Sequence, residues 1–402
     1  MHPPHDLASG SEGYIYVVKR SRIDTERARA EVDSGRIQDG SLMRGLITIC
    51  SLAILVLLSS CADERSVVGP RARVAIPDSA LEAALREIIG KPDGPIRQSD
   101  LQSIESLDLT ARGIRDLTGL EACCGLRYLN VGRNGVSDLS PLARMRSLEV
   151  LYLLRNRVSD LTPLAGLSSL KTLGLSANML ESIGPLSNLT GLRVLSCDSN
   201  PIGDLGPLQT LHGLRALSIG SQEVVDLSPL SGLVELETLY VHGTNVADIE
   251  ALAGLKALKL LSLVGNQITS TDALAGLTML QQLNVGSNRI ADLSGMPHAD
   301  SLRQVNLAGN QITEIDALAV LENVERLSLG LNNISDITAL SGLAHLLTLD
   351  LNDNEIVDIG PLVDNPDLGR RSRVNLTGNP LSEQSVQEHI PALRERGVRV
   401  YY

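Results

Sequence analysis

The chain has 402 residues and a formal net charge of −12, with 47 acidic against 35 basic side chains. It contains neither phenylalanine nor tryptophan, so leucine, isoleucine and valine must fill its core. An acidic surface argues against nucleic acid as a partner, because phosphate binding depends on clustered lysine and arginine. The length exceeds that of an ordinary single domain, so the sequence should contain either several domains or one elongated array.

Residues 1–42 are polar, carry Lys19, Arg20 and Arg22, and precede a second methionine, Met43. A chain that starts at Met43 would have a signal sequence of ordinary length. We therefore expect residues 1–42 to be an over-extended gene start, with a disordered cytoplasmic tail as the alternative. Removing residues 1–60 would leave the net charge at −12, because that stretch holds seven basic and seven acidic residues.

Residues 43–60 have the features of a secretory signal. The run from 45 to 58 is nearly all apolar, follows Arg44 and ends in small residues, which is the pattern of a signal peptide before its cleavage point. A transmembrane anchor is the alternative. However, the ~14 strongly apolar residues fall short of the ~20 that a helix needs to span a bilayer.

The end of this run, Leu58-Ser59-Ser60-Cys61, resembles the lipobox of bacterial lipoproteins. The resemblance implies that Cys61 becomes the lipidated N-terminus of the mature protein, and several acyl chains hold a protein on a membrane durably. Ala62 follows in place of the aspartate that typically retains lipoproteins at the inner membrane. We therefore expect a cell-envelope protein anchored through Cys61, with the outer membrane favoured and either its periplasmic or its surface face possible.

Residues 61–73 form a short polar linker, and residues 74–103 should form an N-terminal cap. A helix is predicted within 76–90, where Asp78 or Ser79 can cap its start and Gly90 can end it. Its apolar face should close the open end of the core that follows, and it consists of Leu81, Leu85, Ile88 and Ile89.

From residue 104 to 381 a 22-residue unit recurs almost without a break. Aligned on its apolar residues, the unit reads L-x-x-L-x-L-x-x-N-x-I followed by x-D-L-x-P-L-x-x-L-x-x. Positions 4 and 6 alternate with polar neighbours, which predicts a short strand with positions 4 and 6 inward and positions 3, 5 and 7 outward. Twelve copies begin at Ile104, Leu126, Leu148, Leu170, Leu192, Leu214, Leu236, Leu258, Leu280, Leu302, Val324 and Leu346, and a thirteenth at Arg371.

This pattern resembles the 22-residue class of leucine-rich repeats found in bacterial internalins and in regulatory subunits of protein phosphatases. The resemblance implies an α/β solenoid, a leucine-rich-repeat horseshoe with a concave parallel sheet and about 13 repeats. Because a solenoid grows by adding coils, one elongated domain is expected rather than several globular ones.

Two polar positions have structural explanations. Position 9 is asparagine in ten of thirteen copies, and its short amide can satisfy the backbone of a buried turn, which predicts an internal asparagine ladder. Position 13 is aspartate in nine of twelve copies, often three residues before a proline. An acceptor followed by proline is typical of a helix start. A row of metal-binding aspartates is the alternative.

Residues 382–402 should cap the other end. Residues 382–396 are predicted to be helical, with Gly397 as the stop and 398–402 as a final strand. Pro391 should kink that helix or begin its second half. Polar caps at both ends are what a soluble solenoid needs.

The remaining cysteines give no disulfide framework. Cys197 takes an inward strand position, and Cys123 takes an inward position beside Cys124. A buried thiol next to an exposed one is expected there, with a vicinal disulfide as the alternative. The sequence lacks nucleotide-binding, zinc-protease and C-x-x-C motifs. We therefore predict no catalytic residue, no metal site and no cofactor.

The outward strand positions are the candidate binding surface. All three tyrosines of the array lie there, and Tyr128 and Tyr152 should approach within about 8 Å of each other. Exposed aromatic, aliphatic and arginine side chains together are typical of interface cores, although tyrosine also favours strands for its own sake. The predicted contact residues are Tyr128, Val150, Tyr152, Leu154 and Arg155, with Tyr240 and His242 as a second candidate.

The sequence thus predicts a monomeric, lipid-anchored envelope scaffold that binds a protein or other macromolecule on its concave face. A structural or envelope-maintenance scaffold without a dedicated ligand is the alternative. An enzyme is not expected, because His242 has no carboxylate at an adjacent outward position to orient its imidazole.

Overall fold

The computed structural model describes residues 72–220 and 223–402. The chain divides into two units, Met1–Ala62 and Asp63–Tyr402. The predicted signal sequence, Cys61 and the linker as far as residue 71 lie outside the described residues. Within the described part, no helix is long and apolar enough to cross a bilayer.

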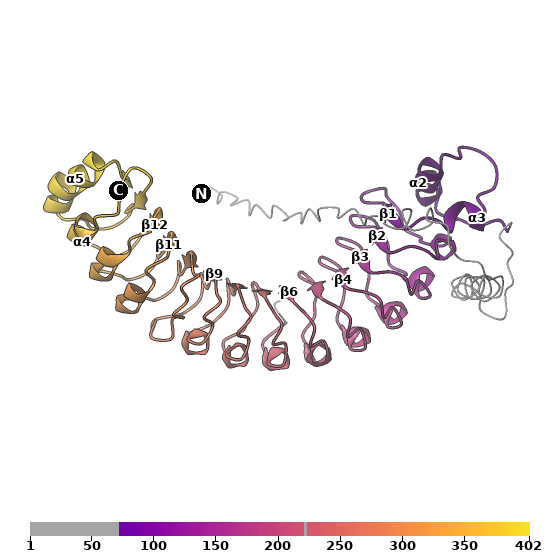
Figure 1. The fold of residues 1–402 in the computed structure, drawn as a ribbon, viewed down its shortest axis with the longest axis horizontal. Coiled ribbons are helices and arrows are strands. Elements are labelled where there is room, and N and C mark those ends of the chain that lie inside the picture. Colours follow the sequence, from indigo (N-terminus) through magenta and orange to yellow (C-terminus); the bar gives the residue numbers. More distant parts are fainter. Residues whose placement is uncertain (1–71, 221–222) are drawn as a thin grey trace, which may run out of the picture. The chain divides into compact units, whose positions relative to one another are not determined.

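The second unit is built on a parallel sheet of 14 strands that pair in chain order. Each coil contributes one strand, and the coils follow one another along an arc whose inner side the strands line (Figure 1). The strands are β1 (Ser106–Asp108), β2 (Tyr128–Asn130), β3 (Val150–Tyr152), β4 (Thr172–Gly174), β5 (Val194–Ser196), β6 (Ala216–Ile219), β7 (Thr238–Val241), β8 (Leu260–Ser262), β9 (Gln282–Asn284), β10 (Gln304–Asn306), β11 (Arg326–Ser328), β12 (Thr348–Asp350), β13 (Arg373–Asn375) and β14 (Arg399–Tyr401). The predicted concave parallel sheet is confirmed.

Period-two alternation along each strand produces the core. In β3, Leu151 is fully buried while Val150 and Tyr152 on either side are partly exposed. Leu151 pairs in register with Leu129 before it and Leu173 after it, so identical positions stack from coil to coil. Burying each such leucine contributes roughly 1.5–3 kcal/mol. The buried side chains of all coils form one continuous hydrophobic core.

The convex side is formed mainly by short 3-10 helices. In repeat 2 the Asp138 carboxylate accepts the Ser140 N–H at 2.8 Å, which confirms the helix-start interpretation of the aspartate row. Hydrogen bonds from the Ser140 hydroxyl and N–H lower the pKa of Asp138. The elements are η1 (Leu120–Ala122), η2 (Ser140–Leu142), η3 (Thr162–Leu164), η4 (Gly184–Leu186), η5 (Gly206–Thr210), η6 (Ser228–Leu230), η7 (Glu250–Leu252), η8 (Asp272–Leu274), η9 (Asp316–Val320), η10 (Thr338–Gly342) and the α-helix α4 (Gly360–Asp364).

The asparagine ladder is also confirmed. Asn156 donates to the Val131 and Leu153 carbonyls, both at 2.9 Å, and accepts the Val136 N–H at 3.0 Å. The other nine asparagines at position 9 make the same pattern of contacts. Each amide therefore joins its own coil to the preceding one and satisfies backbone groups that no strand or helix pairs.

The N-terminal cap contains α2 (Ser79–Ile89) and α3 (Gln98–Leu101). Asp78 caps α2 by accepting the Ala80 and Leu81 N–H groups, and Gly90 ends it with φ +64°. One prediction is wrong: Ile88 is 46% exposed. It lies on the same side of the helix as Leu81, but two turns later in the last turn, where nearly half of its side chain stays exposed.

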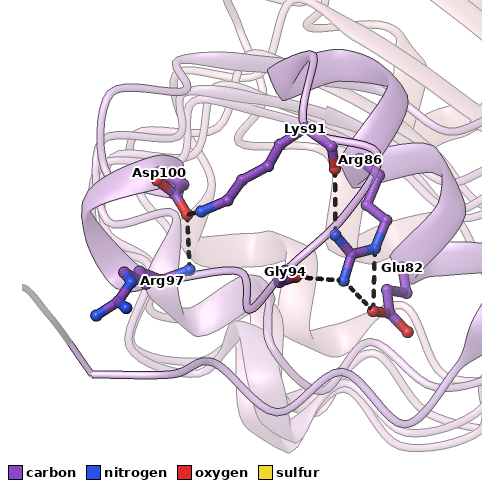
Figure 2. A network of polar contacts seen from close by, with 6 residues as sticks. All are labelled: Glu82, Arg86, Lys91, Gly94, Arg97 and Asp100. Atoms are coloured by element: carbon purple, nitrogen blue, oxygen red, sulfur yellow. Dashed lines mark hydrogen bonds and ion pairs between the residues drawn. The ribbon is translucent and has the colours of Figure 1, made fainter.

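A polar network holds the loop after α2 (Figure 2). The Arg86 guanidinium pairs with Glu82 at 2.8 Å and donates to the carbonyls of Lys91 and Gly94. The Lys91 ammonium pairs with Asp100 at 2.6 Å. These contacts tie the loop to both helices of the cap.

The C-terminal cap consists of the π-helical turn η11 (Ser385–His389), α5 (Ile390–Glu395) and β14. Pro391 lies in the first turn of α5, so the prediction that it begins the second half of the helix is confirmed. Because Arg399 and Tyr401 bond to β13, Val400 directs its backbone groups to the free edge of the sheet. There the Arg394 guanidinium donates to the Val400 carbonyl at 3.0 Å and lies 5.1 Å from the centre of the Tyr402 ring.

Candidate functional site

Tyr128 and Tyr152 form an aromatic pair on the concave face. Their ring centroids are 6.1 Å apart with an interplanar angle of 66°, an edge-to-face arrangement. The predicted proximity is confirmed, and its origin is the register, since Tyr128 pairs with Val150 and Asn130 with Tyr152. An aromatic pair of this kind contributes about 0.5–1.5 kcal/mol beyond its buried area.

The Tyr152 ring leans over Gly174 on the next strand. A Cβ atom at position 174 would lie 2.7 Å from Cδ1 of Tyr152, closer than van der Waals contact allows. The glycine is required here for space and not for an unusual φ angle. Sequence reasoning missed this residue, although a glycine at an outward strand position beside a tyrosine is a usable signal.

Aliphatic side chains extend the aromatic pair. Val150 pairs with Tyr128 and is partly buried, whereas Leu154 is 37% and Val194 38% exposed. Val194 lies on β5, two strands beyond Val150, and was not predicted. We call Tyr128, Val150, Tyr152, Leu154 and Val194 the tyrosine patch.

Burial raises the pKa of the phenols of both Tyr128 and Tyr152. Each is therefore neutral at physiological pH and can donate a hydrogen bond from the edge of an otherwise apolar surface. The predicted contact residue Arg155 follows β3 and is exposed, with φ +54°.

The second candidate, Tyr240 with His242, forms a separate cluster. The two rings lie 5.4 Å apart, and His242 Nε2 is 2.8 Å from the Ser262 hydroxyl. Burial lowers the pKa of His242, so the imidazole is neutral. Four strands at ~4.8 Å spacing put this cluster about 19 Å from Tyr152, and the structure does not bring the two candidates together.

The histidine and serine of this cluster are not arranged for nucleophilic catalysis. Ser262 is only 5% exposed. The Asp198 carboxylate, which could orient an imidazole, instead accepts hydrogen bonds from Ser218 at 2.7 Å and Ser176 at 3.0 Å. The outward polar residues of the middle strands thus form two hydrogen-bonded groups, Ser176 with Asp198 and Ser218, and His242 with Ser262.

Among residues 72–220 and 223–402, no group of three or more histidine, cysteine, aspartate or glutamate side chains is placed to hold a metal ion. Cys123 and Cys197 are buried free thiols and Cys124 is partly exposed. Burial raises the pKa of Cys123 to about 12, so this thiol is unreactive at neutral pH.

Comparisons with known proteins agree with this geometry. The family profile for leucine-rich repeats in two copies matches residues 124–166, 168–210 and 300–345, and a single-repeat profile matches 342–360. The chain is a leucine-rich-repeat protein. A comparison with curated protein sequences finds no match.

Several solved leucine-rich-repeat structures are similar to the chain. Internalin InlF of Listeria monocytogenes is 28% identical with a TM-score of 0.75, over 81% of this chain and 96% of that one. Internalin C2 of the same species is 33% identical with a TM-score of 0.51, over 53% and 97%. The repeats are thus internalin-like.

A more distant similarity shows the fold alone. The leucine-rich-repeat ectodomain of the plant receptor kinase GASSHO1/SCHENGEN3 from Arabidopsis thaliana, in complex with CASPARIAN STRIP INTEGRITY FACTOR 2, is 18% identical. Its TM-score is 0.51, over 70% of this chain and 42% of that one.

Proposed function

We propose that the chain is a lipid-anchored scaffold of the bacterial cell envelope that binds a protein partner at the tyrosine patch. The observation that carries the proposal is the edge-to-face pair of Tyr128 and Tyr152 flanked by exposed Leu154 and Val194. A leucine-rich-repeat solenoid is in general a protein-binding scaffold, and the similar plant ectodomain was solved in complex with a named factor.

The composition of the concave face favours this location. In β9 to β13 the outward residue at repeat position 5 is Asn284, Asn306, Ser328, Asp350 or Asn375, all small polar side chains. Aromatic side chains dominate binding energy at interfaces, and truncation of one anchor commonly costs 2 kcal/mol or more. The tyrosine patch is therefore where contact with a partner would contribute most.

The binding proposal is tested with a double substitution. After in-cell crosslinking and mass spectrometry identify a partner, that partner is purified and titrated against the wild type and Tyr128→Ala/Tyr152→Ala. The matched control is Tyr401→Ala/Tyr402→Ala, which removes two exposed tyrosines from the last strand and the residue after it. We expect at least a tenfold loss of affinity for the first variant and less than twofold for the second. Equal effects would place the partner elsewhere.

The anchor is a separate part of the proposal and rests on the apolar run that ends at Cys61. A thiol that carries the lipid cannot be replaced without loss of the anchor. We expect Cys61→Ala to leave the membrane fraction or to remain uncleaved, as measured by cell fractionation and by the mass of the N-terminal peptide. A cleaved, membrane-bound Cys61→Ala protein would refute lipidation at this cysteine.

A further inference from the structure

Two arginines stand at the rim of the sheet beside the tyrosine patch. Arg133 and Arg155 occupy position 8 of repeats 2 and 3, immediately after the outward residues of β2 and β3, and both are exposed. The Arg133 N–H donates to the Leu154 carbonyl at 2.7 Å, and the Arg155 N–H donates to the Ser176 carbonyl at 2.9 Å. Their backbones are thus fixed on successive coils, on either side of Leu154.

The fold gains nothing from arginine at this position. Arg133 has φ +58° and Arg155 φ +54°, in the left-handed region that side chains disfavour by roughly 1–2 kcal/mol. Position 8 has a positive φ in all twelve described coils, of which four carry glycine and eight carry another residue, among them Leu331 and Asp353. The coil thus accepts many residue types at this position, and local stability does not select arginine there.

Neither guanidinium is engaged by the part of the chain that the structure describes, where no ion pair or hydrogen bond from either side chain is found. The arginines at repeat position 2 differ, because each lies close to a glutamate. Arg127 pairs with Glu149, Arg215 with Glu235 and Arg303 with Glu325. Rim arginines without an acidic neighbour are available to bind a partner's carboxylate through two parallel hydrogen bonds.

Charge complementarity points to an acidic partner. Residues 104–157 hold eight arginines against six acidic residues, whereas the whole chain carries a net charge of −12. The first coils are thus a positive part of a negative molecule, as are residues 368–402 with six arginines against three acidic residues, and an acidic segment would be attracted to them.

The aliphatic side chains decide the class of partner. Exposed Leu154 and Val194 gain most stability against aliphatic groups, which polypeptide side chains supply more fully than hydroxyl-rich polysaccharides do. We propose that Arg133 and Arg155 bind the carboxylates of an acidic protein segment whose apolar side chain packs on the tyrosine patch. This inference rests on the proposed function and specifies the chemistry of its partner.

The test uses labelled peptides as defined probes. A fluorescein-labelled octapeptide of alternating aspartate and leucine is titrated against the purified protein by fluorescence anisotropy, beside asparagine–leucine and aspartate–glycine octapeptides. We expect the aspartate–leucine peptide to bind at least tenfold more tightly than either comparison peptide. Arg133→Gln/Arg155→Gln should lose that advantage and most of the salt dependence, while its circular dichroism spectrum and Tm stay unchanged.

The matched control is Arg326→Gln/Arg373→Gln, which removes two exposed outward guanidinium groups from β11 and β13. It should change the affinity less than twofold. Unchanged binding in the Arg133→Gln/Arg155→Gln variant would overturn the inference. Polygalacturonate that competes as well as the aspartate–leucine peptide would overturn it in favour of an acidic glycan.

Capture of the cellular partner separates this inference from the proposed function. If Tyr128→Ala/Tyr152→Ala loses the partner and Arg133→Gln/Arg155→Gln keeps it, binding at the tyrosine patch is supported. The inference that the two arginines bind an acidic segment is then refuted. If neither pair of substitutions affects capture, both fail. Loss in both variants, with retention in the control, supports both.

Discussion

Removal of one asparagine from the internal ladder should destabilise the array far more than removal of its neighbour. Asn332 is 7% exposed, whereas Asn333, the next residue, is exposed and makes no side-chain hydrogen bond to the described residues. Asn332→Ala and Asn333→Ala therefore make the same chemical change one residue apart, which removes helix propensity, chain entropy and composition as explanations of any difference.

The magnitude follows from the contacts of Asn332. Its amide donates to the Leu307 carbonyl at 3.1 Å and the Leu329 carbonyl at 2.9 Å, and its oxygen accepts the Ile312 N–H at 3.1 Å. Each of the two carbonyls also accepts a hydrogen bond from a neighbouring asparagine of the ladder. The substitution thus leaves only the Ile312 N–H buried without an acceptor.

An unsatisfied buried donor costs about 1–3 kcal/mol, and each lost hydrogen bond about 1 kcal/mol. We therefore expect Asn332→Ala to lower the free energy of unfolding by about 3 kcal/mol, and Asn333→Ala by less than about 0.5 kcal/mol.

Urea denaturation followed by far-ultraviolet circular dichroism measures both values, because the chain has no tryptophan to report unfolding. Hydrogen exchange gives a local check, since the Ile312 amide should lose protection only in Asn332→Ala. A difference below about 1 kcal/mol between the variants would refute the view that the ladder satisfies otherwise unpaired backbone.

Three further outcomes are expected. Gly174→Ala should displace the Tyr152 ring, change the near-ultraviolet circular dichroism of tyrosine and weaken partner binding severalfold, whereas Gly166→Ala, where a Cβ meets open space, should do neither. Arg394→Ala should uncover the free edge at Val400 and produce concentration-dependent association in analytical ultracentrifugation. Hydrogen bonds lower the folded-state pKa of the capping aspartates below 3.8, so their stabilisation is complete above about pH 5 and is lost as the pH falls through those lowered values. Replacement of these aspartates by asparagine, which keeps the acceptor oxygen, should therefore reduce the fall in Tm between about pH 5 and pH 3. The aspartates are Asp138, Asp160, Asp226, Asp292 and Asp336.

The fold was predictable because each repeat position has one environment. Leu151 and Leu153 are the apolar residues of an alternating strand, so they must face the core. The same two positions are apolar again 22 residues later in the next coil. Asn156 could be assigned from the same periodicity, since only an internal turn needs an amide at that spacing. Stacking of identical coils turns these local rules into the whole array.

The rest depended on contacts between coils that periodicity does not specify. The buried Asn365, which is 0% exposed and donates to the Leu340 and Leu343 carbonyls, takes an inward position where most other copies have leucine. The exposure of Ile88 depends on where the first coil ends beneath α2. The hydrogen bonds of Asp198 to two serines require knowledge of which side chains meet across neighbouring strands.

Outward positions carry the function in a repeat protein because the inward ones are already determined by packing. An outward residue is informative when it departs from what the coil itself prefers. Tyr152 excludes any side chain at position 174 on the next strand, and Arg133 and Arg155 place two exposed guanidinium groups at the rim beside it. All three lie within two neighbouring coils, and none improves the packing of the core. Their proximity is better explained by one partner that contacts them together than by independent variation of surface residues.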